Sequence, residues 1–264
     1  MIADERLELI RLKLKRADKH IRDLQAAMDA FGNSNPYKVS TKRNPKTRQL
    51  IYYLSSVEPT PDCFATITGD AINNLRSALD HLAQQLYLVG SNTTIYRDQT
   101  SFLIAQSAKK FKAGLPGKIE GMRQKAIDDI CALEPYAGGK GADLWIFHRL
   151  NNIDKHRLIV TVGAVLRSVD LGALVSAQFN RAFGMKITPV SVFFRTANIK
   201  FPLKAGDKLL ADSTDTEPNK NMQFRFEIVI NEPGLIEGKS LLETIVEFSN
   251  RVKGIVEAFR PHLT

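Results

Sequence analysis

An uninterrupted apolar stripe runs through the first thirty residues of this chain. Apolar side chains recur there at alternating steps of four and three: Ala3, Leu7, Ile10, Leu14, Ala17, Ile21, Leu24, Met28 and Phe31. This spacing matches the turn of an α-helix and predicts one long helix over about residues 3–32, ended by Gly32-Asn33. A helix of that length hides such a stripe only by packing along other helices, so we expect a helical bundle.

Further segments repeat the same periodicity and predict the rest of the bundle. Matching stripes indicate helices over about residues 67–89, 118–134, 143–158 and 239–260. Because their apolar seams resemble one another, we expect near-aligned packing in an antiparallel helical bundle.

Two regions break the helical period and read as β-structure. Residues 37–57 favour two strands around the turn that begins at Asn44, which predicts a β-hairpin. Residues 159–231 alternate β-rich runs with short turn signals, which favours an antiparallel sheet. The sequence therefore predicts a single α+β domain over residues 1–264. Its hairpin follows the first helix, and its antiparallel sheet precedes the last helix.

Composition narrows the classes of function. The formal net charge of +9 favours polyanionic partners such as RNA or nucleotides over acidic ones. No apolar run is long enough to span a membrane, and the charged first thirty residues do not resemble a signal peptide. Cys63 and Cys131 are far apart and lack a zinc-site spacing, so we expect a cytoplasmic protein without a disulfide framework.

Titratable side chains concentrate on two of the predicted helices. One group lies in the segment Arg76–His81 and the other in the segment His148–Arg157. Arginine, aspartate and histidine are the side chains that general acid–base chemistry on a phosphate ester would use. The candidate catalytic residues are Arg76, Asp80, His81, Arg149, Asn152, Asp154, His156 and Arg157.

Helical geometry separates the two groups. At about 100° per residue, Arg149 and His156 lie within roughly 20° of each other, and Asn152 shares their side. Arg76 and His81 lie roughly 140° apart, so they serve one site only if a neighbouring helix or subunit completes it. Both groups also have a structural interpretation. Arg76 and Asp80 could form an ion pair, and the cations of the second group could lie at the carboxyl end of a helix, where the helix dipole favours them.

The segment Arg76-Ser77-Ala78-Leu79-Asp80-His81 resembles the Arg-x4–6-His signature of the HEPN superfamily of helical-bundle ribonucleases and nucleotide-binding modules. That resemblance implies metal-independent RNA cleavage without a cofactor, usually in a homodimer. In that scheme His81 acts as general base or acid, Arg76 stabilises the phosphorane, and His156 with Arg149 or Arg157 supplies a second acid and a phosphate clamp. The chain also resembles an uncharacterised bacterial family that pairs "LRSALDH" with "DKHR".

Two alternatives remain open from the residues alone. A divalent metal could bind a set composed of Asp80, His81, Asp154 and His156, although the usual metal-binding motifs are absent. The chain could instead be a binding module without catalysis, or the partner of another protein. In that case sheet aromatics such as Phe224 and Phe226 would share one face and stack on bases if they are exposed.

Overall fold

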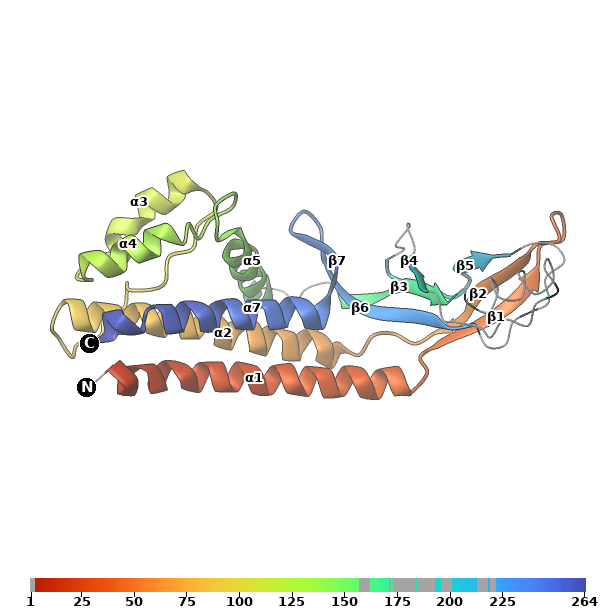
Figure 1. Ribbon diagram of the computed structural model, residues 1–264, viewed down its shortest axis with the longest axis horizontal. Helices are drawn as coiled ribbons and strands as arrows, with labels where there is room; N and C mark the ends of the chain where they lie inside the picture. The colour runs from red at the N-terminus through yellow and green to blue at the C-terminus, as the bar shows by residue number, and fades with distance from the viewer. Residues whose placement is uncertain are drawn as a thin grey trace.

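The molecule is elongated, with helices at one end and strands at the other (Figure 1). The computed structural model describes residues 3–156, 162–170, 172, 184, 193–195, 201–212, 218 and 222–264. Over these residues the chain has the mixed α+β architecture that the sequence predicts. No helix in this part of the chain is both long enough and apolar enough to cross a membrane.

Three long helices form the body of the bundle. Helix α1 (Ala3–Asn33) packs against both α2 (Asp62–Gly90) and α7 (Leu241–Ala258) and runs opposite to them (Figure 1). A shorter helix, α5 (Ala142–His156), packs on α2 and α7. The predicted apolar stripes face inward as expected, and Leu7, for example, is completely buried.

The helix predicted over residues 118–134 is wrong in its bounds. Helix α3 (Ala108–Ile119) ends just after that predicted helix begins, and α4 (Gln124–Ala132) is a separate element. The break lies at Gly121, whose φ of +83° is a conformation that glycine adopts easily. A Cβ on Gly90 would lie 2.2 Å from the Gly121 carbonyl oxygen, so the glycine at the end of α2 lets this turn approach closely.

The strands form two small antiparallel sheets instead of one hairpin and one separate sheet. The predicted hairpin is present as β1 (Tyr37–Arg43) and β2 (Leu50–Val57), but β5 (Lys208–Ala211) pairs with β2 and extends it. The second sheet has the order β4-β3-β6-β7. Its strands are β3 (Val162–Asp170), β4 (Phe193–Arg195), β6 (Phe224–Glu232) and β7 (Ile236–Ser240).

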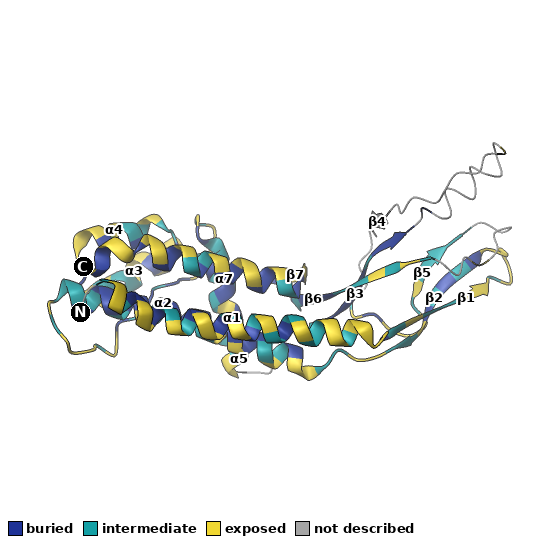
Figure 2. Cartoon of the chain, turned by 60° about the horizontal axis from the view of Figure 1, so that its bottom comes forward, coloured by how far each residue is buried: buried dark blue, intermediate teal, exposed yellow. Residues whose placement is uncertain are grey.

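An aromatic cluster joins the bundle to the sheets. Phe31 near the end of α1 contacts the Phe64 ring at 5.7 Å between centroids and the Tyr37 ring at 6.0 Å. Tyr37 in turn contacts Phe226 of β6 at 4.7 Å. Figure 2 shows that burial is densest on the inner faces of the helices, while the β1–β2 end of the molecule carries many exposed residues.

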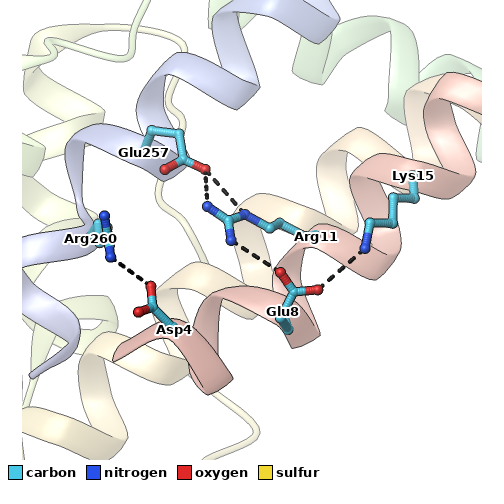
Figure 3. Close-up of polar contacts among 6 residues, drawn as sticks. All are labelled: Asp4, Glu8, Arg11, Lys15, Glu257 and Arg260. Atoms are coloured by element: carbon cyan, nitrogen blue, oxygen red, sulfur yellow. Dashed lines mark hydrogen bonds and ion pairs between the residues drawn. The ribbon is translucent and has the colours of Figure 1, made fainter. Parts of the chain in front are cut away.

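Ion pairs connect the first helix to the end of the chain (Figure 3). Arg11 donates to Glu257 at 2.8 Å and to Glu8 at 3.1 Å, and Arg260 donates to Asp4 at 2.8 Å. A short 3-10 helix, η1 (Arg260–Leu263), follows α7 and packs on α1 and α2. Arg11, one of the basic residues of α1, is therefore paired within the bundle.

Candidate functional site

Arg76 is held inside the fold by two hydrogen-bond acceptors. Its Nη2 donates to Asp80 Oδ1 at 2.8 Å and to the Phe102 carbonyl oxygen at 2.7 Å. The amide of Phe102 donates to the same Asp80 oxygen at 3.0 Å. Only 8% of Arg76 is exposed, and burial lowers the pKa of its guanidinium, partly offset by the charge of Asp80. The ion pair between Arg76 and Asp80 that was considered from the sequence is present. Because both side chains also hydrogen-bond the backbone of Phe102, they fix the chain around Phe102 to α2.

His148 is the histidine that lies near Arg76, and it was not among the candidate catalytic residues. Burial, reinforced by the charge of Arg76, lowers the pKa of His148 to about 4. Its Nε2 lies 3.0 Å from Nδ2 of Asn152, and its Nδ1 is buried with no described partner. The Trp145 ring lies 6.0 Å away between centroids. Its position in the sequence could have identified His148 as a candidate, because it follows Phe147, which is buried, and lies one helical turn before Asn152.

Among the described residues, no hydrogen bond or ion pair connects Arg76 with the predicted site residues His81, Arg149 or His156. His81 is exposed, and its pKa is lowered by partial burial and by the charge of Lys13 on α1, with Asp80 acting in the opposite direction. His156 is exposed at the end of α5. Arg149 is exposed and lies over the Trp145 ring at 5.8 Å. Arg157 lies outside the described residues.

Asp154 faces a different part of α2. Burial and the charge of Asp70 raise the pKa of its carboxyl group, while Lys155 lowers it. Asp70 also lies 4.0 Å from Nδ1 of His20, a buried histidine on α1. Asp154 therefore belongs to a junction of α1, α2 and α5 that is separate from the Arg76 network.

No set of side chains suited to a metal ion is present among the residues that the structure describes. Groups of three or more histidine, cysteine, aspartate or glutamate side chains with metal-binding geometry are absent there. The proposed set of Asp80, His81, Asp154 and His156 lies wholly within this part of the chain, so it does not form such a group.

The β1–β2 hairpin presents an exposed basic surface at the far end of the molecule from the bundle termini (Figure 1). Between Lys38 and Val57 the sequence has no acidic residue. We call its exposed cations the hairpin cations: Lys38, Lys42, Arg43, Lys46 and Arg48.

The tip of this hairpin has an ordered backbone. The Asn44 side-chain oxygen accepts hydrogen bonds from the Lys46 amide at 2.9 Å and the Thr47 amide at 3.2 Å. Arg48 adopts a φ of +57°, and its amide donates to the Asn44 carbonyl oxygen at 2.8 Å. Lys42 lies over the Tyr53 ring, with its Nζ 4.6 Å from the centroid. The turn therefore holds its cations on a defined scaffold.

A groove with a volume of about 950 Å³ lies where the end of α1 meets β1, β6 and the start of α7. Phe224 and Phe226 line it and are half-buried, with their rings packed on Tyr52 and Tyr37 respectively. The two phenylalanines therefore share a face, as the spacing predicted, but each already contacts a tyrosine of the hairpin.

No family model matches this chain, and comparisons with curated proteins and with solved structures find no similar protein.

Proposed function

We propose that this protein binds RNA through the hairpin cations and does so without catalysis. The observation that carries this proposal is the run of exposed hairpin cations, with no acidic residue between Lys38 and Val57. On α1, Arg11, Lys15 and Lys19 are paired with carboxylates, while Arg16 and Arg22 form no ion pair with a described residue. At the hairpin tip, Lys46 and Arg48 form no ion pair with any described residue.

Exposed cations on a protruding strand pair, with Lys46 and Arg48 unpaired among the described residues, favour phosphate as the partner. Each lysine or arginine that neutralises a phosphate releases a condensed counterion, which makes binding favourable and dependent on salt. The Tyr53 ring beside Lys42 adds an aromatic surface of the kind that stacks on single-stranded bases. The net charge of +9 has the same sign as this local surface.

A HEPN-like ribonuclease is the second candidate, and the proximity of Arg76 and His148 favours it. Burial keeps the His148 imidazole neutral at pH 7, as a general base must be. Against it, the Arg76 guanidinium is already bonded to Asp80 and Phe102, and His81 faces the α1 side. A composite site across a homodimer would need His81 or His156 of a second copy.

Binding is tested by fluorescence anisotropy with a labelled, mixed-sequence single-stranded RNA at several salt concentrations. The test variant is Lys46→Ser with Arg48→Asn, because asparagine tolerates the positive φ at position 48. The matched control is Lys109→Ser with Lys112→Ser on α3, which removes the same charge elsewhere. We expect the hairpin variant to reduce the slope of log K against log salt by about 1.4, at about 0.7 per phosphate contact.

Equal losses in the hairpin and control variants would show non-specific attraction to net charge and would refute the hairpin proposal. The same RNA, incubated with the protein in EDTA, tests the second candidate. Cleavage that disappears in Arg76→Lys and His148→Gln variants would establish a ribonuclease. Intact RNA in every condition would leave binding as the activity.

A further inference from the structure

We propose that the groove between α1, β1, β6 and α7 binds a small organic cation: a protonated amine on an apolar or aromatic body. This site shares only Lys38 with the hairpin cations, lies away from the hairpin tip and does not depend on RNA binding. Its volume of about 950 Å³ lies within the range of roughly 300–1,000 Å³ that is usual for small-molecule sites.

The lining of the groove is aromatic and thioether-rich. Phe31, Tyr37 and Phe226 form a continuous set of ring contacts along it, and Met28 and Met222 also line it. Aromatic faces bind apolar bodies and also attract cations, with a strength that rises as water is excluded. The rings therefore accommodate either part of the proposed ligand.

The charges of the groove favour a cation over an anion. Its acidic lining residues are Asp29, Glu227 and Glu243, and Lys38 is the one cation among the described lining residues. Glu227 is paired with Arg167. Asp29 accepts a hydrogen bond only from the neutral Gln25 amide, at 2.7 Å, and Glu243 forms no ion pair with a described residue. Within the part of the chain that the structure describes, two carboxylates that line the aromatic groove thus have no cationic partner.

The position of Asp29 adds an independent reason. It lies about one turn before the carboxyl end of α1, where the helix dipole disfavours a negative charge, and the last turn of that helix contains no basic residue. A ligand ammonium group would relieve this repulsion. Glu243 lies in the first turn of α7, where a carboxylate is stable, so the two carboxylates approach the groove from two helix ends.

Tyr37 supplies a neutral polar group inside the groove. Its hydroxyl is buried with no described partner, and burial together with the charge of Glu58 raises its pKa to about 12. The phenol therefore stays protonated at neutral pH and can hydrogen-bond a polar group of the ligand. The arrangement of aromatic walls, a neutral hydroxyl and two terminal carboxylates fits an amphipathic amine.

Three probes of equal shape test this inference: 4-phenylbutylamine, 4-phenylbutanol and 4-phenylbutanoate. Binding is followed by NMR chemical-shift changes in the protein. We expect the amine to bind at least tenfold more tightly than the alcohol, and the carboxylate to bind most weakly. The shifted resonances should include those of Tyr37, Phe224 and Phe226.

The test variant is Asp29→Asn with Glu243→Gln, which keeps side-chain shape and removes both charges. The matched control is Glu247→Gln, an exposed glutamate one turn further along α7 that does not line the groove. The double variant should lose the tenfold preference for the amine while it still binds the alcohol, and the control should keep it. Equal binding of all three probes to the parent protein, or binding of none, would overturn the inference. Neither result would bear on RNA binding at the hairpin.

Discussion

Arg76 on α2 and His148 on α5 lie within electrostatic range across the contact between their helices, and burial together with the arginine charge keeps the imidazole neutral. The two residues lie on helices that are distant in the sequence and pack against each other. The pair also gives the bundle a dependence on pH.

Stability should fall as the pH falls from about 6.5 towards 4. The pKa of His148 is about 4 in the fold, against an ordinary value of 6.5, so between these values the unfolded chain binds a proton that the folded chain excludes. The contribution of His148 is complete above pH 6.5 and is lost progressively below it. Urea unfolding at pH 7 and pH 5 should differ by on the order of 1 kcal/mol more in the parent than in His148→Gln, with allowance for solvent screening. An equal pH dependence in both proteins would contradict this assignment.

Arg76→Met should destabilise the protein by about 2–3 kcal/mol. The substitution removes the arginine donor from the Phe102 carbonyl oxygen and from Asp80, and the loss is limited because Asp80 is partly exposed and still accepts from the Phe102 amide. His81→Ala, one turn away at an exposed position, should change stability by less than about 0.5 kcal/mol. Urea unfolding of both variants measures the difference. A small loss for Arg76→Met would mean that the buried network is not structural.

Asp154→Asn should stabilise the protein at neutral pH by about 0.5 kcal/mol. Burial and the neighbouring Asp70 raise the pKa of this carboxyl group, so its ionised form is unfavourable in the fold, and asparagine removes the charge while it keeps the shape. Thermal unfolding at pH 7 should show a higher midpoint. A lower unfolding midpoint for Asp154→Asn would indicate that a cation near Asp154 stabilises its ionised form.

Gly90→Ala and Gly254→Ala should act in opposite directions. A Cβ on Gly90 would meet three backbone atoms of the Gly121–Arg123 turn, so alanine there should cost about 2 kcal/mol or more. A Cβ on Gly254, inside α7, meets nothing within 4 Å, so alanine should stabilise that helix by about 0.5–1 kcal/mol. Thermal melts of the two variants check both signs.

The sequence predicted the bundle well because its information is local. The stripe that begins at Ala3 requires a long helix wherever its partners lie, and α2, α5 and α7 follow the same rule. The prediction of helix 118–134 was wrong because it treated Ile119 and Met122 as parts of one seam across Gly121, where the chain turns. Strand pairing could not be predicted from local sequence patterns. Nothing within Lys208–Ala211 indicates that this segment pairs with β2 and extends the hairpin.

In the candidate site too, contacts within one helix could be predicted from the sequence and contacts between helices could not. The ion pair of Arg76 and Asp80 follows from helical spacing and is present. The approach of Arg76 to His148, and of Asp154 to Asp70, depends on how α5 packs on α2, which no spacing within either helix encodes. The groove depends on even more distant relationships, because its walls come from both ends of the chain.

The ion pairs of Arg11 with Glu257 and of Asp4 with Arg260 join residues that are 246 and 256 positions apart. On a ribosome that adds about 5–20 residues per second, the first helix is complete on the order of 10–50 s before its last partner exists. During that interval the stripe on α1 can pack on α2 but has no α7 to cover its remaining apolar surface. The bundle is therefore complete only after α7 and η1 have been synthesised, and part of the apolar stripe of α1 stays uncovered until then.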